Sequence, residues 1–393
     1  MLSGISGNVL ILGMVSFLTD VSSEMIYPLL PLFLTTVLGA GPAFLGVIEG
    51  VAESTAALLK LVSGIVSDRT RSRKGLVLAG YALSSLARPL VAAATGPAAV
   101  LAVRFADRVG KGVRTSPRDA LIADSSDSTV RGKAYGFHRA MDHAGALVGP
   151  LLATLLLAGA ALDLRTVFWL SAVPGLLAVL LIILRVRDVE RKRTSDGSIL
   201  GAVPRGGLRR YLAVLVLFTL GNSSDAFLLL RAGQLGVPPA RIPLLWAFFH
   251  LVKMLASTPF GALSDRIGRR RVIVAGWAVY ALSYLGFAAA ASEPACWLLF
   301  AVYGTFYGMT EGTEKAFVAD LVPAEARGGA FGWYHFAVGV GALPASVLFG
   351  LIWERAGQGA AFLFGAGLAA LAAVLLLALV REALPEERNS RAF

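Results

Sequence analysis

Ionisable side chains interrupt long apolar stretches of this sequence at helical spacing. Asp20, Glu24 and Tyr27 follow one another four and three residues apart, which places them on one face of a helix. A charged group at the centre of a bilayer costs at least about 2.5–3.5 kcal/mol on insertion scales, so it must face a cavity or a partner. These carboxyl groups are therefore candidates for binding a proton or a solute.

Other apolar stretches carry charges in the same way. Arg108 and Lys111 share one helix face with Arg104 and Asp107. We expect carboxyl groups in an apolar bundle to exchange protons, and the candidates are Asp20, Glu24, Asp142 and Glu311. Candidates for solute binding are Tyr27, Arg108, Lys111, Arg139, Asn222, Asp225, His250 and Lys253. The alternative for these charges is structural pairing, for example Arg139 with Asp142 or Arg108 with Asp107.

The elements that position these residues are long apolar segments. The 393 residues are 56% hydrophobic and 16% charged, against roughly 25% charged in soluble domains, and the mean hydropathy is +0.71. Segments long enough to cross about 30 Å of hydrocarbon lie at 8–38, 43–66, 75–96, 98–120, 131–158, 165–185, 210–233, 241–264, 271–291, 295–318, 328–352 and 359–381. The sequence predicts an all-α integral membrane protein of twelve transmembrane helices.

The basic residues report topology. The net charge of +11 would suggest nucleic acid in a soluble protein, but the Arg and Lys residues gather in alternate loops, as cytoplasmic loops do. This pattern predicts cytoplasmic termini and no nucleic-acid partner, with contact to anionic lipid head groups. Cys296 is the only cysteine, so a disulfide within the chain is excluded.

The two halves of the chain repeat one another at an offset near 200. In the same order, 17–24 matches 218–225, 64–69 matches 261–266, 119–124 matches 315–320 and 131–136 matches 327–332. Two parallel repeats around a midplane site are an architecture of secondary transporters. We therefore expect a six-helix bundle over 1–186, a cytoplasmic linker over 187–208 and a second bundle over 209–393.

The segment from Gly261 through Asp265-Arg266, Gly268 and Arg269 resembles the G-x-x-x-D-R-x-G-R-R signature of the major facilitator superfamily. The first-half copy, Gly64-x-x-x-Asp68-Arg69, is similar but has Arg71 where the family usually has glycine. The resemblance implies a cytoplasmic latch in which the carboxylate caps a neighbouring helix and pairs with arginines. The implied gating residues are Gly64, Asp68, Arg69, Gly261, Asp265, Arg266, Gly268 and Arg269.

A second pattern, Gly136-x8-Gly145-x3-Gly149-Pro150, resembles the glycine-proline motif of antiporters in the same superfamily. Small residues let helices approach closely. The resemblance implies that Gly145, Gly149 and Pro150 seal the cavity against leak, and that the first, fourth, seventh and tenth helices line this cavity. The sequence departs from the motif after Pro150.

These patterns favour a proton-coupled antiporter that exports a small organic solute by alternating access. The first alternative is a proton-coupled symporter importing an organic anion or nutrient, clamped by Arg108, Lys111, Arg139 and Lys253. A copper importer is a second alternative, because His250-x3-Met254 could bind Cu(I). No enzyme motif is present, and we expect no cofactor, a monomer, and a place in the bacterial inner membrane.

Overall fold

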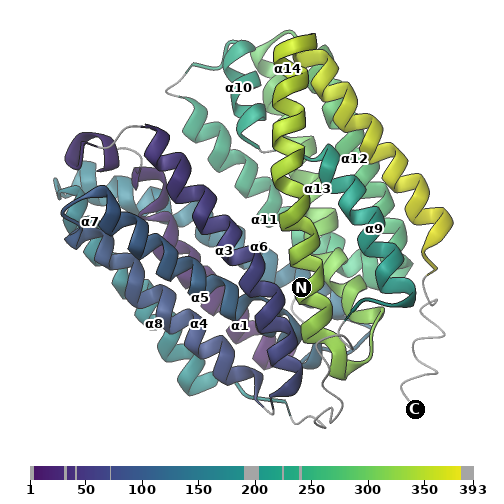
Figure 1. Cartoon of the computed structure of the whole chain (residues 1–393), viewed down its shortest axis with the longest axis horizontal. Coiled ribbons are helices and arrows are strands. Elements are labelled where there is room, and N and C mark those ends of the chain that lie inside the picture. Colours follow the sequence, from purple (N-terminus) through teal and green to yellow (C-terminus); the bar gives the residue numbers. More distant parts are fainter. Residues whose placement is uncertain are drawn as a thin grey trace. The chain divides into compact units, whose positions relative to one another are not determined.

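The structure is a computed structural model that describes residues 4–30, 33–39, 42–70, 72–189, 203–223, 225–238 and 241–381. Every regular element in these residues is helical, and none of them forms a strand. Figure 1 follows the helices along the chain from purple to yellow.

The helices of the described residues form twelve spans, six in each sequence repeat. The first repeat holds α1 (Gly7–Glu24) with η1 (Tyr27–Leu29) and η2 (Phe33–Val37), α3 (Pro42–Arg69), α4 (Arg73–Ala87) with η3 (Arg88–Ala93), α5 (Pro97–Asp124), α6 (Arg131–Thr154) with η4 (Leu155–Gly159), and α7 (Leu164–Leu170) with α8 (Ala172–Arg185). The second holds α9 (Gly206–Gly221) with α10 (Ala226–Gln234), α11 (Ile242–Ile267), α12 (Arg269–Ala289), α13 (Glu293–Asp320), and α14 (Arg327–Leu379) preceded by η7 (Ala324–Ala326).

The last helix, α14, contains two of these spans. Its 53 residues correspond to about 80 Å at 1.5 Å per residue, far more than the ~30 Å of a hydrocarbon core. Gly357 divides it, because its φ of 86° lies outside the helical region. The two parts coincide with the predicted segments 328–352 and 359–381.

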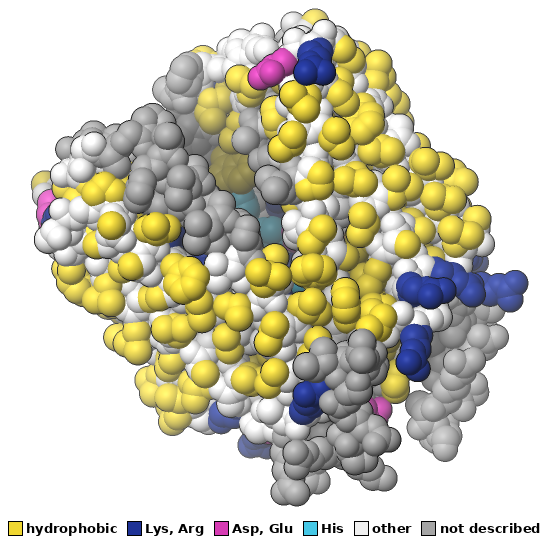
Figure 2. Space-filling view, viewed as in Figure 1, with side chains coloured by type: hydrophobic (Ala, Val, Ile, Leu, Met, Phe, Trp, Pro, Cys, Tyr) yellow, Lys and Arg dark blue, Asp and Glu magenta, His cyan; other side chains and the backbone are white. Residues whose placement is uncertain are grey.

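Seven helices of the described residues, with α14 counted once, are long and apolar enough to cross a membrane by length and composition alone. The charged helix α5 is not one of them, because its Arg104, Asp107 and Arg108 are charged, although all three are buried inside the protein. The outward side chains are apolar instead, such as Leu58 on α3 and Leu184 on α8, which are 57% and 65% exposed. Figure 2 shows hydrophobic side chains over most of the described surface in that view. The chain is therefore a multi-pass membrane protein.

Several segments that the sequence predicted as continuous helices are interrupted, and in this respect the prediction was wrong. Two of the interruptions lie beside predicted site residues. The segment 8–38 leaves the α-helix after Glu24 and continues as η1 and η2. The segment 210–233 breaks at Asn222, whose φ of −97° and ψ of 90° are extended. Asn222 and Asp225 therefore flank a helix break and do not share one continuous helix face. The repeat match pairs Glu24 with Asp225, so both repeats break their first helix at the matched carboxylate.

The chain divides into two compact units, which are described separately. Unit 1 comprises Met1–Ser126, Met141–Ala202 and Pro323–Phe336, and unit 2 comprises Asp127–Ala140, Val203–Val322 and Ala337–Phe393. Each unit thus contains the first turns of the fifth span of the other repeat: α14 begins in unit 1 and α6 begins in unit 2.

Close packing of α4 on α5 forms part of the interior of unit 1. Gly80 of α4 and Gly110 of α5 face one another, and a Cβ atom added to either would lie 2.6 Å from the carbonyl oxygen of the other. Small residues allow this backbone approach between membrane helices. In unit 2, α13 packs against both α11 and α12.

We expect Gly80→Val to lower the free energy of unfolding by about 1–3 kcal/mol, because the added methyl groups have no space between α4 and α5. Thermal unfolding in detergent measures this change. Gly367→Val is the matched control, since Gly367 lies in α14 with open space around its Cα. An equal loss of melting temperature in both variants would contradict the packing argument.

Candidate functional site

A carboxylate at the end of α3 binds the start of α14 within unit 1. Asp68 Oδ1 accepts a hydrogen bond from the backbone N–H of Gly328 at 2.8 Å, and Oδ2 accepts one from Gly329 at 2.6 Å. The first N–H groups of a helix lack partners within the helix, and the helix dipole favours an anion there. Gly64, one turn earlier, permits the approach, because a Cβ atom there would collide with the carbonyl oxygen of Gly328.

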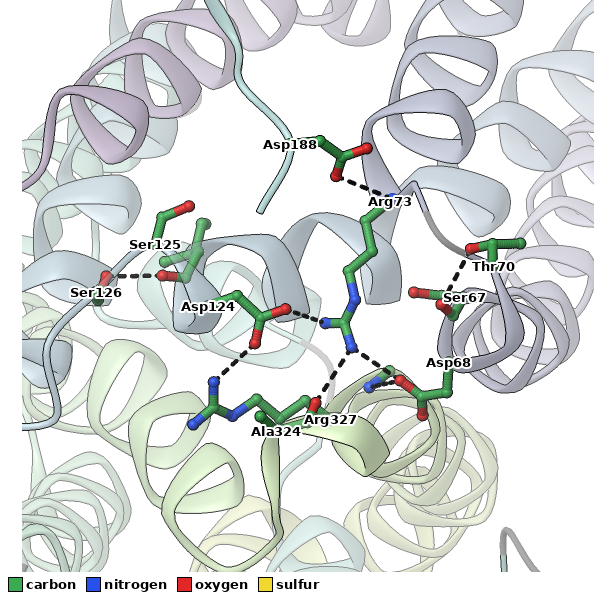
Figure 3. Close-up of polar contacts among 12 residues, drawn as sticks. Ser67, Asp68, Thr70, Arg73, Asp124, Ser125, Ser126, Asp188, Ala324 and Arg327 are labelled. Atoms are coloured by element: carbon green, nitrogen blue, oxygen red, sulfur yellow. Dashed lines mark hydrogen bonds and ion pairs between the residues drawn. The ribbon is translucent and has the colours of Figure 1, made fainter. Parts of the chain in front are cut away.

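A buried arginine completes this arrangement. Arg73 is 0% exposed and places its Nη2 2.8 Å from Asp68 and its Nη1 3.3 Å from Asp124. Arg327 of α14 also binds Asp124, at 2.7 Å. Figure 3 shows Asp68, Arg73, Asp124 and Arg327 pointing toward one another from different helices. We call these four residues, with the N–H groups of Gly328 and Gly329, junction 1.

Unit 2 contains an equivalent arrangement, junction 2. Asp265 of α11 accepts hydrogen bonds from the backbone N–H groups of Gly132 at 2.9 Å and Lys133 at 2.8 Å, at the start of α6. Arg269, also 0% exposed, pairs with Asp265 and lies 3.2 Å from Asp320, and Asp320 pairs with Arg131. Just ahead of α6, the Thr129 hydroxyl and backbone N–H donate to Asp127, which lowers the pKa of the Asp127 carboxyl.

The junctions contain three of the eight residues implied by the loop signature, namely Asp68, Asp265 and Arg269. Two more, Gly64 and Gly261, pack against Gly328 and Gly132 at the capped helix starts. Gly268 ends α11 with a φ of 102°. Arg69 is partly exposed and Arg266 is exposed, and the guanidinium that binds Asp68 comes from Arg73 instead. Sequence reasoning assigned no role to Arg73, Asp124, Arg131, Asp320 and Arg327. The sequence did contain a signal for four of these residues, because the internal repeat pairs Asp124 with Asp320 and Arg131 with Arg327.

The glycine-proline pattern of α6 packs against α1 within unit 1. A Cβ atom at Gly145 would lie 2.5 Å from the carbonyl oxygen of Phe17 and 2.8 Å from Cβ of Asp20. At Gly149 it would lie 2.7 Å from Cβ of Glu24. Pro150 follows inside the helix. The two glycines therefore hold α6 against the part of α1 that bears both predicted proton-binding carboxylates.

Charged groups gather around these carboxylates in unit 1. Asp20 interacts electrostatically with Asp142 and Glu24, which repel it, and with Arg114 and Lys111, which attract it. Asp142 is buried and accepts a hydrogen bond from Ser16 of α1. The structure thus brings together three of the four predicted proton-binding residues.

Basic side chains of α5 and of η3, which precedes α5 in the chain, surround Glu24. Lys111, Arg88, Arg108 and Arg104 all attract it. Arg88 binds Asp107 at 2.7 Å, and Arg104 lies 3.6 Å from Asp107. The Arg104 guanidinium also stands 5.2 Å from the centre of the Tyr27 ring. Tyr27, Arg108 and Lys111 therefore belong to one charged group with the carboxylates, which we call the unit 1 cluster.

The remaining predicted residues gather in unit 2. Tyr303 and Tyr307 of α13 donate hydrogen bonds to Asp225 at 2.7 Å and 3.2 Å. The Lys253 ammonium lies 3.5 Å from the centre of the Tyr307 ring and 3.9 Å from that of Phe249, and it is only 5% exposed.

Two further predicted charges act on Lys253, namely Glu311 and Arg139, which lie 3.9 Å apart. His250 packs its ring against Trp246 and Phe249. The Oδ1 atom of Asn222 is buried and accepts no hydrogen bond from the described residues. We call Asn222, Asp225, His250, Lys253, Arg139 and Glu311, with the tyrosines, the unit 2 cluster. Across the described part of the chain, no three His, Cys, Asp or Glu side chains group as metal ligands.

Comparison with known proteins agrees with this architecture. A sequence model described as the Major Facilitator Superfamily matches residues 12–232 and again residues 211–393. An uncharacterised MFS-type transporter of Methanocaldococcus jannaschii is 36% identical over 383 residues, covering 95% of each chain. The chain belongs to the major facilitator superfamily, and is therefore a secondary transporter of a small molecule and not an enzyme.

Solved structures share the fold. The human organic anion transporter MFSD10 has a TM-score of 0.80 at 17% identity, with 94% of this chain and 99% of that chain covered. The fucose:proton symporter of E. coli has a TM-score of 0.79 at 15% identity, with 95% and 98% covered. At these identities the likeness concerns the fold alone.

We expect Asp68→Asn to destabilise junction 1, because the start of α14 loses a charged cap and Arg73 loses one of its two carboxylates. Cap removal costs about 0.5–2 kcal/mol, and removing one partner of a buried ion pair costs about 3–5 kcal/mol. Faster hydrogen exchange at Gly328 and Gly329, with a lower melting temperature, measures this loss. Glu354→Gln, at an exposed carboxylate, is the control, and equal exchange in both variants would refute the assignment.

Proposed function

We propose that the chain is a proton-coupled antiporter that exports a small organic solute by alternating access. The observation that carries the proposal is the contact of α6 with α1 in unit 1. Gly145 and Gly149 pack against α1 at the level of Asp20 and Glu24. The helix with the glycine-proline pattern typical of antiporters is therefore in direct contact with the helix that bears these two carboxylates. Like charges in a low-dielectric interior repel strongly, so gaining or losing a proton changes the energy of this cluster.

In this proposal Asp20, Glu24 and Asp142 exchange the proton in the unit 1 cluster, and Glu311 does so in the unit 2 cluster. The substrate binds the remaining groups, namely Tyr27, Arg108, Lys111, Arg139, Asn222, Asp225, His250 and Lys253. Both clusters mix acids and bases, and the unit 2 cluster adds aromatic faces. Such surroundings suit a polar, zwitterionic or charged organic solute, because the side chains can form both charge-assisted hydrogen bonds and ring contacts with it.

The two junctions supply the gate of the transport cycle. A carboxylate on a helix N-terminus and a doubly paired arginine form a discrete contact that is either made or broken, as rigid-body transitions require. The close glycine contacts, Gly64 with Gly328 and Gly261 with Gly132, allow the two helices of each junction to pack tightly while the junction is formed. Arg69, Arg266 and Gly268 act at the ends of the same loops.

In this proposal the protein lies in a bacterial inner membrane, and the junctions and both termini are on its cytoplasmic side. The gathering of Arg and Lys residues in alternate loops supports this orientation, with the basic side chains near anionic lipid. The protein works as a monomer with protons and one small solute as its partners, and without nucleic acid.

Transport in reconstituted vesicles tests the antiport. A thermal-stability screen with lipophilic cations, organic anions, amino acids and sugars first selects the substrate, since a ligand at 100 times its Kd adds about 2.7 kcal/mol to the folded state. Vesicles with an acidic lumen in an alkaline medium then accumulate the substrate while the lumen loses protons, followed with a trapped pH dye. Accumulation only when the medium is the acidic side would instead establish proton symport.

We expect Glu24→Gln to abolish substrate accumulation driven by a pH gradient, because the amide cannot exchange a proton. Exchange of labelled for unlabelled substrate at equal pH persists, since that half-cycle needs no proton transfer. Both assays use the same vesicles, so the exchange assay is an internal control for folding. Accumulation at the wild-type rate in Glu24→Gln would remove Glu24 from the proton pathway.

A further inference from the structure

A buried histidine–aspartate pair lies beyond junction 1, further along the same two helices. His335 Nε2 is 2.8 Å from Asp119 Oδ2, joining the first turns of α14 to α5 inside unit 1. The side chain of Asp119 is 0% exposed and that of His335 is 10% exposed. Neither residue belongs to the loop signature or to the charge clusters.

Other charged and titratable groups lie near this pair on the helices around it. On α5 itself, Arg118 holds the other oxygen of Asp119 at 2.9 Å. Arg118 also donates to the Tyr81 hydroxyl of α4 at 3.3 Å and interacts electrostatically with Asp142 of α6. On α3, the backbone of Lys60 and Leu61 contacts α14 at Gly332, and the Asp68 carboxylate contacts α14 at Gly328. On α14 itself the Tyr334 ring lies 5.1 Å from the His335 ring.

The matching positions of the second repeat carry different charges. Asp119 corresponds to Lys315 in the repeat match, and at the same offset Arg118 corresponds to Glu314 and His335 to Arg139. The local geometry is retained, because Glu314 accepts a hydrogen bond from Trp277 at 3.1 Å, as Arg118 binds the corresponding Tyr81. Where the first half of the chain has Arg139, the second half has His335. Histidine is the one side chain whose ordinary pKa lies near neutral pH.

We propose that Asp119 and His335 form a proton-binding site of the transport cycle, occupied when the start of α14 packs on α5 and emptied when the two separate. In the packed arrangement the protonated imidazole donates Nε2–H to the Asp119 carboxylate. When α14 leaves α5, Arg118 stays with Asp119, whereas His335 loses the anion that stabilised its charge and releases the proton to water. The site thus couples gate movement to proton movement, and this deepens the antiport proposed above, on which it rests.

The sign of the pH effect follows from linkage. The packed arrangement binds the His335 proton more tightly than the separated one, so protonation must favour packing by the same factor. The packed population therefore rises as the pH falls through the neutral range and declines as the pH rises. The arginines of junction 1 differ from His335 in this respect, because arginine keeps its charge throughout this range.

Distances between two spin labels measure this population without any substrate. Gly75→Cys on α4 and Ala326→Cys ahead of α14 are both exposed in unit 1, in a background where the single native cysteine is replaced by Cys296→Ser. We expect the short-distance fraction in the full-length protein to increase severalfold between pH 8.5 and pH 5.5.

Two substitutions separate the proton from the packing. His335→Gln keeps a hydrogen-bond donor of similar reach but removes the titration of this site, so the wild-type pH midpoint of the distance distribution is lost. His335→Arg, which places the residue of the second repeat at this position, keeps the short distance at every pH. His143→Gln replaces another buried histidine of unit 1 and retains the wild-type pH midpoint.

Either of two results would overturn the inference: a pH-independent distribution in the wild-type background, or an unchanged midpoint in His335→Gln. The vesicle assay separates this failure from failure of the antiport itself. Spin-label distances that titrate through His335, in a protein whose vesicles show no proton-driven counterflow, would preserve the proton site and refute the antiport.

Discussion

The organisation of this transporter depends on two arginines that are buried and doubly paired. Arg73 and Arg269 are both 0% exposed, and an uncompensated buried charge is strongly destabilising. Each therefore requires two carboxylates, one that ends a helix and caps another, and one at the end of α5 or α13. The capped helix has glycine as its second residue, Gly132 in α6 and Gly328 in α14, because its backbone must approach the capping helix closely. These demands fix where α6 and α14 begin, and explain why each unit contains the first turns of the other repeat's fifth span.

The two repeats share the charges of the junctions but differ at the positions beside them. The junctions have the same charges in the same order in both repeats, whereas the adjacent positions differ in sign, as Asp119 and Lys315 do. Residues that hold a helix end serve both repeats alike, so symmetry costs nothing there. In the proposed cycle, proton exchange and solute recognition need different groups, and the clusters of unit 1 and unit 2 differ in their carboxylates, bases and aromatic rings.

The sequence was sufficient for the helices and insufficient for their interruptions. Apolar length locates a membrane span because lipid contacts only the outer face, and the boundary of α14 at Gly357 follows from length and glycine alone. The breaks after Glu24 and at Asn222 lie within apolar runs, where hydropathy does not distinguish a helix from an irregular segment packed inside the protein. Arg73 was missed for a related reason. Arg69 adjoins the signature aspartate in sequence, but the side chain that reaches Asp68 comes from the first turn of the next helix.

The placement of fixed and titratable charges along α5 and α14 has a physical logic. Arginine remains charged at any physiological pH, so Arg73 and Arg327 keep their attraction for carboxylates, and in the proposed cycle the movement of a helix breaks the junction. His335 lies two turns further along α14, and its contact with Asp119 has a strength that depends on a proton. A contact of fixed strength beside one of adjustable strength gives a two-state element that remains well ordered, yet whose balance a small free energy can reverse. Replacing His335 by a permanently charged arginine would leave a contact with Asp119 of fixed strength, without that adjustment.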